Sequence, residues 1–367
     1  MDLTKNKPIR KVYYDANFSI NQYRGMGKFI NNFVNVLKDK FEIVGLLKSN
    51  ISKKEFLSFG YSNYILWEQI SLTFFSFFNK GIYLFPYNSA PVFLNRNNFN
   101  VLILHDLIFL ERLSGLTIKQ RIGKFYRSLI INLIINKVDC VITVSEFSKK
   151  QIIEKFDLPS DKVSVIYNTI DPIIIDSSIC VPKKKYFFHI GADSSYKNTK
   201  SLIFAFALLP DYIKECYKLK ILGIRNSNTL GEYKNLAKNL NIFDRIDFLE
   251  YQTDKEVAKL FQEASLFLFP SFFEGFGIPL IEAMKYGCPL VISNSSCFPE
   301  IAGDSATYFD PSYSESISSA IVSCLENKID RELKVELGYK RYKMFNFDNF
   351  KLQLEDWLAK VDIHKSK

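Results

Sequence analysis

The segment PSFFEGFGIPLIEAM, residues 270–284, decides the fold because it joins an apolar run to a helical pattern through a glycine-rich loop. The run Ser265–Phe269 before it is almost continuously apolar, which is typical of a strand buried on both faces of a parallel sheet. Pro279 stands near the expected first position of the helix, where a missing N–H costs no hydrogen bond. Gly275 and Gly277 let the backbone approach a ligand, and a helix N-terminus favours an anion such as phosphate.

Two carboxylates in this segment point to a polyol ligand. Glu274 lies in the predicted loop, and Glu282 follows one to two helical turns later. Both side chains can accept hydrogen bonds from hydroxyls, which suits a sugar together with a ribose. The structural alternative is a helix-capping glutamate followed by a surface glutamate.

The same strand-to-helix pattern recurs along the chain. The 367 residues are enough for two domains at about 100–200 residues each. Short apolar runs alternate with helical patterns such as 232–239 and 254–264. Repeated βα units in two blocks predict an α/β protein with two doubly wound domains. The runs are 12–14, 101–104 and 140–144 in the first half, and 186–190, 219–222, 265–269 and 289–292 in the second.

A linker is expected around residues 171–185, which contain prolines, serines and three consecutive lysines. We therefore predict an N-terminal domain over 1–175 and a C-terminal domain over 176–340. Residues 341–367 are expected to carry a C-terminal helix that packs back on the N-terminal domain. The pattern over about 331–360 predicts one continuous helix.

The net charge of +9 lies wholly in the first half of the chain. Residues 1–175 hold 23 basic and 14 acidic side chains, whereas residues 176–367 hold 25 of each. This asymmetry suggests an acidic partner, either nucleic acid, an anionic membrane surface or a phosphorylated substrate. Solvated surface lysines are the alternative. The segments 65–78 and 118–136 are rich in apolar residues, and the second also carries several basic ones, which suits a membrane surface or a core helix with a solvated face.

Several classes of protein and site are not expected. The six cysteines form no CxxC pair and have no histidine at ligand spacing, so reduced thiols fit better than disulfides or zinc. The basic N-terminus lacks an apolar stretch, and no run reaches the ~20 residues of a membrane span. A cytoplasmic location is expected. The absence of an Asp-x-Asp motif argues against a metal-clamped site.

Taken together, these motifs resemble the retaining glycosyltransferases of family 4, also called glycosyl transferases group 1. That family has the GT-B fold, in which two Rossmann-like domains face each other across a cleft. Its hallmark Glu-x7-Glu matches Glu274 and Glu282. The resemblance implies that Glu274 contacts hydroxyls of a donor sugar and that Glu282 holds the ribose of the nucleotide. The loop amides of residues 276–280 would then lie against the donor sugar and diphosphate.

Other segments resemble the family in the expected order. YRGMGK at 23–28 matches a glycine-rich loop that closes on the donor phosphates, His105 matches a residue near the donor sugar, and Lys197 matches the cation that neutralises the diphosphate. Tyr196 replaces a common arginine, so either Arg24, Lys28 or Lys200 supplies the missing charge or the donor binds more weakly. The residues assigned to donor binding are Gly25, Gly27, Lys197, Tyr251, Glu274, Gly275, Phe276, Gly277, Ile278, Pro279, Leu280 and Glu282, and those assigned to catalysis are His105, Lys197 and Glu274.

The resemblance implies transfer of a hexose with retention of configuration, no metal and no cofactor. GDP-mannose is the first choice of donor because the segments 105–110 and 144–150 resemble the mannosyltransferase branch, while UDP- and dTDP-sugars remain open. The expected acceptor is a glycan, lipid-linked, in bacterial surface polysaccharide (O-antigen or capsule) synthesis, with peripheral contact to the cytoplasmic face of the inner membrane. The alternatives are a sugar-nucleotide epimerase or phosphorylase of similar architecture, and a basic nucleic-acid-binding protein, although no DNA- or RNA-binding motif is present.

Overall fold

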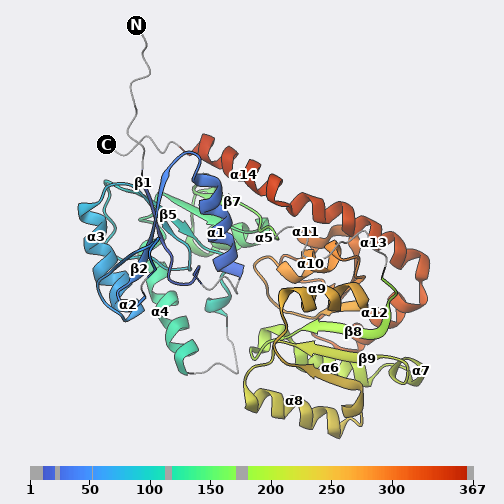
Figure 1. Ribbon diagram of the computed structural model, residues 1–367. Coiled ribbons are helices and arrows are strands. Elements are labelled where there is room, and N and C mark those ends of the chain that lie inside the picture. Colours follow the sequence, from blue (N-terminus) through green and yellow to red (C-terminus); the bar gives the residue numbers. More distant parts are fainter. Residues whose placement is uncertain (1–10, 21–24, 52, 112–117, 171–180, 362–367) are drawn as a thin grey trace. The chain divides into compact units, whose positions relative to one another are not determined.

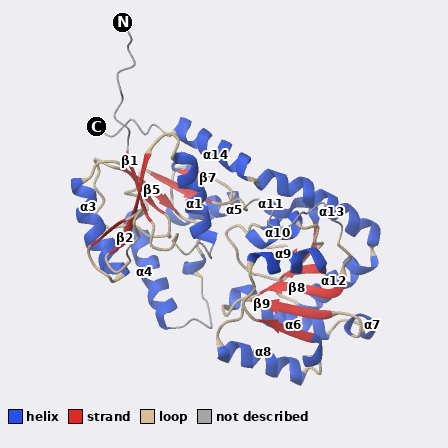
Figure 2. Cartoon of the chain, viewed as in Figure 1, coloured by secondary structure: helices blue, strands red, loops and turns tan. Residues whose placement is uncertain are grey.

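The computed structural model describes residues 11–20, 25–51, 53–111, 118–170 and 181–361. The chain forms two compact units, each an α/β structure built on a parallel sheet (Figures 1 and 2). The first unit contains residues 1–110, 122–168 and 350–367, and the second contains residues 111–121 and 169–349. The chain therefore leaves the first unit after residue 110 and returns to it twice, at residues 122 and 350.

The first unit holds a sheet in the order β3-β2-β1-β4-β5-β6-β7, and every strand pair described in it is parallel. The order reverses between β1 and β4, which creates a switch point of the Rossmann type. The strands are β1 (Lys11–Asp15), β2 (Glu42–Lys48), β3 (Leu57–Phe59), β4 (Ile82–Phe85), β5 (Phe99–Ile103), β6 (Cys140–Thr143) and β7 (Val163–Val165).

Helices cover both faces of this sheet. One face packs Tyr13 of β1 with Trp67 and Ile134. The other face carries α1, whose Phe29 and Phe33 rings meet Phe350 and Trp357 of α14 at centroid distances of 5.6 and 5.8 Å. The helices are α1 (Gly25–Leu37), α2 (Tyr64–Leu66), the π-helical turn η1 (Trp67–Leu72), α3 (Thr73–Phe78), α4 (Ile118–Ile134), α5 (Glu146–Phe156) and α14 (Phe347–Lys360).

The second unit repeats the design with the order β10-β9-β8-β11-β12-β13, again parallel at every described pair. The strands are β8 (Lys184–Ile190), β9 (Lys218–Leu222), β10 (Ile246–Leu249), β11 (Ala264–Phe269), β12 (Leu290–Ser293) and β13 (Ala306–Phe309). The helices are α6 (Thr199–Ala207), α7 (Asp211–Lys214), α8 (Ser227–Asn239), α9 (Asp254–Glu263), α10 (Ile278–Lys285), α11 (Phe298–Ala302), α12 (Ser314–Glu326) and α13 (Lys328–Tyr342).

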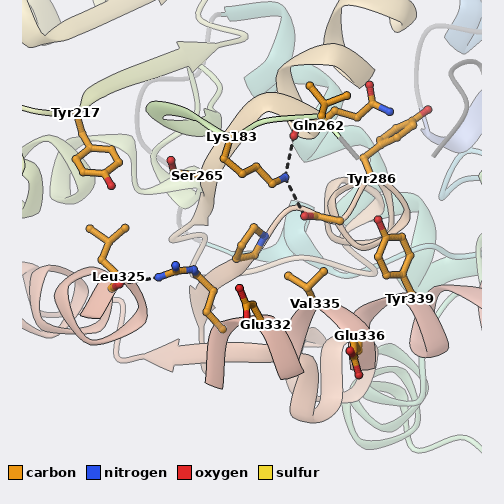
Figure 3. Close-up of a pocket in the computed structure, with 14 residues that line it drawn as sticks. Lys183, Tyr217, Gln262, Ser265, Tyr286, Leu325, Glu332, Val335, Glu336 and Tyr339 are labelled. Atoms are coloured by element: carbon orange, nitrogen blue, oxygen red, sulfur yellow. Dashed lines mark hydrogen bonds between the residues drawn. The ribbon is translucent and has the colours of Figure 1, made fainter. Parts of the chain in front are cut away.

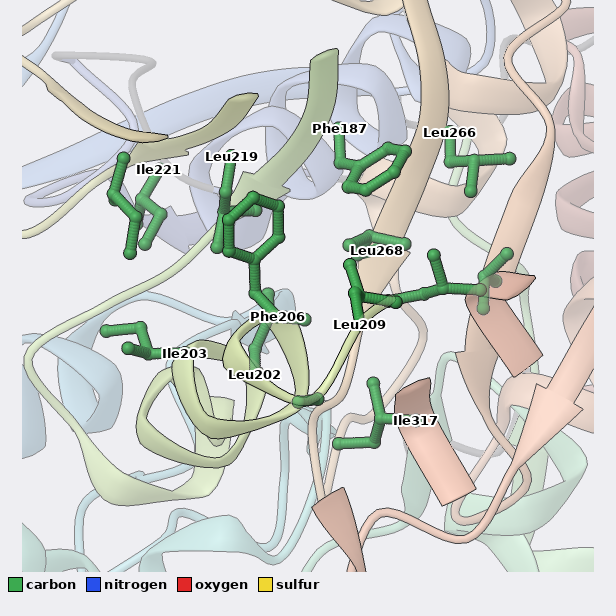
Figure 4. Close-up of a cluster of buried hydrophobic side chains, with 14 of the residues drawn as sticks. Phe187, Leu202, Ile203, Phe206, Leu209, Leu219, Ile221, Leu266, Leu268 and Ile317 are labelled. Atoms are coloured by element: carbon green, nitrogen blue, oxygen red, sulfur yellow. The ribbon is translucent and has the colours of Figure 1, made fainter. Parts of the chain in front are cut away.

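Neighbouring residues of β8 serve opposite faces of this second sheet, as the period of two requires. Phe187 joins the cluster in Figure 4, where Leu202 and Phe206 of α6 lie against the sheet. Phe188 meets Phe261 of α9 on the other face at a centroid distance of 5.1 Å. A strand buried on both faces must be apolar throughout, which explains the continuous runs in the sequence.

The predicted apolar runs all coincide with strands, and both predicted helical segments lie in α8 and α9. The single helix predicted over 331–360 is wrong. α13 ends at Tyr342 and α14 begins at Phe347, because Asn346 adopts an extended conformation and its side chain accepts a hydrogen bond from the Asn349 N–H at 2.9 Å.

The compact units also have boundaries that differ from the domain boundaries expected at residues 175 and 340. They change at Asn168 and Asn349, so α13 stays with the second unit. The expected linker over 171–180 lies outside the described residues. In the part of the chain that is described, no helix is long and apolar enough to cross a bilayer.

Replacing Trp357 tests how α14 is held. Trp357 is buried, meets Phe33 edge-on and donates its indole N–H to the Cys140 Sγ at 3.4 Å. We expect Trp357→Ala to lower the free energy of unfolding of the first unit by about 3–5 kcal/mol, since it leaves a cavity. Urea unfolding followed by Trp67 fluorescence measures this unit, and the exposed Leu352→Ala is the control. Equal midpoints for the two variants would contradict the packing.

Candidate functional site

The predicted donor residues gather at the switch point of the second sheet. β8 and β11 are neighbours there, and the strand order reverses between them. Lys197 follows β8 and Glu274 follows β11, so both lie at the carboxyl edge of the sheet. Ligands of open α/β sheets bind at this edge.

Lys197 and Glu274 form an ion pair in this position. The Lys197 Nζ lies 2.5 Å from the Glu274 Oε1, and the two side chains are only 12% and 15% exposed. The ammonium also lies 4.6 Å from the centroid of the Phe269 ring. With little water around it, this pair attracts more strongly than a surface pair and also pays more desolvation. The pair thus presents a fixed cation beside a hydrogen-bond acceptor.

Two neighbouring loops hold the backbone of the Glu274 loop. The Glu274 N–H donates to the Ser296 Oγ at 2.9 Å, and that hydroxyl donates to the Glu274 carbonyl at 2.8 Å. Ser296 has a φ of 59°, which is uncommon for serine and aims its hydroxyl into the loop. The Phe272 N–H donates to the Tyr196 carbonyl at 2.8 Å. Sequence reasoning missed Ser296, because it follows a different strand, β12.

The loop passes into α10 as predicted. Gly277 precedes the helix with a φ of +85°, where a side chain would be strained, and Pro279 stands in its first turn. Pro279 has no N–H and the Leu280 N–H donates to the Gly277 carbonyl at 2.9 Å, so it is the positive pole of the helix dipole that favours an anion at this turn. Phe276 is buried against Phe345 at a centroid distance of 5.6 Å. Its side chain therefore anchors the loop.

The carboxyl end of β8 is shaped by close backbone packing. A Cβ on Gly191 would lie 2.8 Å from the Thr199 Oγ1, and Gly223 has a φ of +103°. Behind Gly191, His189 donates its Nδ1–H to the Leu268 carbonyl at 3.0 Å and accepts from the Thr199 hydroxyl at 2.9 Å. Burial lowers the pKa of His189 to about 3, so this imidazole is neutral and ties β8 to β11. The sequence analysis did not single it out.

His105 lies at the corresponding edge of the first sheet, after β5. Its Nε2 contacts the Pro86 carbonyl at 3.1 Å, and because a carbonyl only accepts, this nitrogen carries the proton. Its backbone N–H donates to the Asn88 Oδ1 at 2.9 Å, and its ring meets Phe29 edge-on. Burial lowers the pKa of His105 to about 4. The imidazole is therefore neutral, with the Nδ1 lone pair facing away from this bond.

A buried acid cluster occupies the switch point of the first sheet, and the sequence analysis missed it. Asp15 ends β1, and its Oδ2 accepts from the Tyr64 hydroxyl at 2.8 Å. The same hydroxyl lies 3.0 Å from the Glu68 Oε1. Glu68 also accepts from the Ser89 hydroxyl at 2.7 Å and from the Tyr126 hydroxyl. One tyrosine proton thus serves two carboxylates.

The pKa values of the two carboxyl groups indicate where protons lie in this cluster. Burial raises the pKa of Asp15 to about 7, with the charge of Glu68 adding to the effect, and burial likewise raises the pKa of Glu68. A proton on the Asp15 Oδ2 would donate to Tyr64, which could then donate to Glu68. With a proton on Asp15 the Tyr64 hydroxyl can donate to Glu68, whereas two charged carboxylates would compete for that one hydroxyl and repel each other.

The remaining predicted residues are more widely placed. Gly25 and Gly27 belong to the first turns of α1, so the glycine-rich loop predicted over 23–28 is helical from Gly25 onward. A Cβ on Gly27 would lie 2.9 Å from the Phe18 carbonyl, which gives this glycine a packing role. Tyr23 and Arg24 lie outside the described residues. Tyr251 follows β10, the edge strand that β9 separates from β8, and is exposed.

Ile278, Leu280 and Glu282 all lie on α10, where the sequence places them. Ser145 caps α5 by accepting a hydrogen bond from the Ser148 N–H. Among the described residues, no group of three or more His, Cys, Asp or Glu side chains could hold a metal. The described cysteines are free.

A pocket in the second unit lies at the opposite edge of the sheet (Figure 3). It has a volume of about 600 Å³ and is lined by Lys183, Ser265 and Pro289, which stand at the amino ends of β8, β11 and β12. The Lys183 Nζ donates to the carbonyls of Gln262 and Gly287 at 2.8 and 2.9 Å. The pocket is therefore separate from the Lys197–Glu274 site.

Comparison with known families agrees with this geometry. The sequence model of Glycosyl transferases group 1 matches residues 173–344, and that of Glycosyltransferase Family 4 matches residues 75–173. O-antigen chain mannosyltransferase B of Escherichia coli is 31% identical over 243 residues, which are 63% of this chain and 62% of that protein. O-antigen chain mannosyltransferase RfbU of Salmonella typhimurium is 30% identical over 241 residues, 65% of this chain and 64% of that protein. The chain thus matches less than two thirds of each relative.

Solved structures show the same fold. The Anabaena protein HepE in complex with UDP gives a TM-score of 0.73 at 17% identity and covers 96% of this chain and 100% of that one. WaaG, a glycosyltransferase involved in lipopolysaccharide biosynthesis, gives 0.71 at 13% identity, with 95% and 99% covered. The likeness extends over both α/β units.

Asp15→Asn tests the acid cluster. Folding raises the pKa of Asp15 from 3.8 to about 7, so its stabilisation is complete below 3.8 and is lost as the pH rises through 7. We expect the free energy of unfolding of the first unit to fall between pH 5 and 7 with a slope of up to about 1.4 kcal/mol per pH unit. Asp15→Asn should flatten this slope, since its amide donates to Tyr64 at any pH.

Urea unfolding at several pH values, followed by tryptophan fluorescence, measures the slope. The exposed Asp39→Asn is the matched control and should keep the wild-type slope. A slope in Asp15→Asn equal to that of the control would contradict the shared proton.

Proposed function

Because this chain belongs to the glycosyltransferases of family 4 and has their GT-B fold, we propose that it moves a hexose from a nucleotide sugar to a glycan acceptor with retention of configuration. The observation that carries the proposal is the Lys197–Glu274 pair at the switch point of the second sheet. This pair places a cation for a diphosphate next to a carboxylate for sugar hydroxyls. The N-terminus of α10 adds a second positive pole at the same edge.

The proposed reaction depends mainly on electrostatic stabilisation of the leaving group. Negative charge develops on the departing diphosphate, and Lys197 and the positive pole at the N-terminus of α10 would stabilise it. Glu274 would orient the donor sugar, and Glu282 the ribose. His105 would position the sugar, and its neutral ring adds no repulsion as positive charge builds at the anomeric carbon. The acceptor hydroxyl attacks on the leaving-group face, so the leaving phosphate oxygen takes its proton.

Lys197 pairs with Glu274 in the structure, so a donor would have to share or displace this contact. A diphosphate beside Lys197 would draw the ammonium toward it, while the carboxylate turns to the sugar hydroxyls. The Ser296 hydroxyl bonds both the N–H and the carbonyl of Glu274. This fixed backbone would keep the Glu274 side chain close to both Lys197 and the sugar during the exchange.

We propose GDP-mannose as the donor, because O-antigen mannosyltransferases are among the relatives and the segments 105–110 and 144–150 resemble that branch. HepE, solved with UDP, keeps uridine donors under consideration. The proposed acceptor is a lipid-linked glycan of bacterial surface polysaccharide synthesis, such as O-antigen or capsule, at the cytoplasmic face of the inner membrane.

Glu274→Gln and Lys197→Met test this site. Both changes preserve size but remove the charge, so we expect kcat/KM for transfer to fall on the order of 10²–10³-fold with the fold intact. Thermal-shift screening of GDP-mannose, UDP-glucose and dTDP-rhamnose selects the donor, and nucleoside diphosphate release then measures turnover. The exposed Lys255→Met is the matched control. Wild-type turnover in Glu274→Gln would remove the central claim.

Ser296→Ala separates positioning from chemistry. Without its hydroxyl the Glu274 backbone loses two hydrogen bonds, so we expect a smaller fall in kcat, about tenfold, with donor binding nearly unchanged. Rescue by Ser296→Thr would support the positioning role. Equal losses in the alanine and threonine variants would instead show that any change at this strained position disturbs the loop.

EDTA tests whether the reaction needs a metal. Since Lys197 and the α10 N-terminus supply positive charge for the diphosphate, we expect turnover in EDTA to equal that in buffer. The assay is run on enzyme dialysed against EDTA, with and without added manganese or magnesium. Complete loss of turnover that manganese restores would overturn the metal-independent mechanism.

A further inference from the structure

The pocket at the amino edge of the second sheet is formed entirely by residues of the second unit (Figure 3). Its volume of about 600 Å³ lies within the range of about 300–1,000 Å³ that is usual for ligand sites. Strand β8 has seven residues, so this edge lies about 23 Å from the edge that carries Lys197 and Glu274. The pocket is therefore a separate site, which the proposed transfer reaction does not use.

Two basic side chains hold the walls of the pocket in place. The Lys183 Nζ joins the end of α9 to the turn after α10, because it donates to the Gln262 and Gly287 carbonyls. The Arg331 Nη1 donates to two carbonyls in the last turn of α12 at 2.7 and 2.6 Å. The Tyr339 hydroxyl lies against Gly287, where a Cβ would collide with it. Hydrogen bonds from charged donors are strong, so these walls are set before a ligand binds.

Three tyrosines line the pocket, namely Tyr217, Tyr286 and Tyr339. The Tyr217 ring stacks on Phe187 with a centroid distance of 4.9 Å and an interplanar angle of 13°. The Tyr286 ring stacks on Phe261 at 6.4 Å and 18°. Stacking on core residues fixes these rings, so little side-chain entropy is lost when a ligand contacts them. We call this cavity the tyrosine pocket.

The charged side chains of the tyrosine pocket balance one another. Lys183 and Arg331 are positive, whereas Glu332 and Glu336, one turn apart on α13, are negative. Glu332 also lies 3.6 Å from Lys328, in an exposed pair that contributes little. A phosphate or nucleotide would meet two carboxylates here, and a polyamine would meet two cations. An uncharged ligand meets neither opposition.

The polar groups of the tyrosine pocket include both donors and acceptors. Carboxylates only accept hydrogen bonds, ammonium and guanidinium groups only donate them, and phenols do both. The bonds of Arg331 are made by Nη1 alone, so within the described part of the chain its Nε–H and Nη2 group remain for a ligand. A sugar combines hydroxyls with an apolar face of C–H groups. Tyrosine likewise presents an apolar ring and a polar tip, so the lining matches a sugar on both counts.

We propose that the tyrosine pocket is a second glycan-binding site, which holds a part of the acceptor chain away from the sugar that receives the hexose. The inference rests on the proposed function, in which the acceptor is a glycan, and adds a second place of contact. Glu332 and Glu336 are exposed, so the pocket is open beside α13 and a longer chain can continue out of it. Contact at two places raises the effective concentration of the acceptor at the transfer site.

Isothermal titration calorimetry of the full chain with soluble oligosaccharides of mannose, glucose and galactose tests the proposal. Val335→Trp places a large side chain in the pocket from α13. Leu333→Trp is the matched control, since Leu333 is on the same helix, is 53% exposed and does not line the pocket. A second variant, Glu332→Ala with Glu336→Ala, removes two acceptors at exposed helix positions, where alanine favours the helix. Circular dichroism verifies the fold of each variant.

We expect the wild type and Leu333→Trp to bind at least one of these oligosaccharides with equal affinity. Val335→Trp and the double alanine variant should each lower that affinity on the order of tenfold. A wild type that binds none of them, or variants that bind like the control, would overturn the proposal. Pyrophosphate and spermine are the charged probes. Binding of either one that Val335→Trp weakens, without oligosaccharide binding, would assign the pocket to a charged ligand instead.

Turnover distinguishes this site from the transfer site. With a long glycan acceptor, Val335→Trp should raise KM on the order of tenfold and keep the wild-type kcat, whereas a monosaccharide acceptor should give equal rates for both enzymes. An unchanged KM for the long acceptor would refute the second contact and leave the transfer reaction standing. Glu274→Gln should lose turnover while it keeps wild-type oligosaccharide binding. Retained turnover in that variant would refute the proposed site of transfer, and the calorimetry would still decide the role of the pocket.

Discussion

Parallel strand pairing is the constraint on which the rest of this structure depends. Parallel strands need crossover helices on both faces, so every strand must be apolar on both sides, and polar residues concentrate where the strands end. In each unit the order reverses once, between β1 and β4 and between β8 and β11. At both reversals the polar residues meet: Asp15 with Tyr64 and Glu68 in one unit, Lys197 with Glu274 in the other.

The two clusters lower the free-energy cost of burying charged groups in different ways. In the second unit opposite charges meet, so the attraction between Lys197 and Glu274 offsets part of the desolvation cost of each. In the first unit two carboxyl groups meet, so burial and the charge of Glu68 raise the pKa of Asp15, and the Tyr64 hydroxyl bridges the two groups. His105 and His189 follow a third route, since burial removes their charge altogether. Each edge thus has defined donors and acceptors before any substrate binds.

Much of this could be predicted from the sequence, and the failures have physical causes. The β8 and β11 runs are almost continuously apolar, but β10 carries Asp247 and pairs at the sheet edge, so its pattern is weak. Glu274, Lys197 and the start of α10 lie in local motifs and were predicted. Ser296 and the Asp15 cluster were missed because they depend on contacts between strand ends far apart in sequence. The one available sign was Glu68 with Gln69 inside the apolar segment 64–78.

The acid cluster and the exposed apolar side chains Phe125 and Leu129 share helix α4. Tyr126 of α4 donates to Glu68, and Ile130 and Ile134 pack into the core beside it. These contacts fix the rotation of α4 and therefore aim Phe125 and Leu129 outward. Apolar side chains that face water gain no burial energy, so the fold does not explain them.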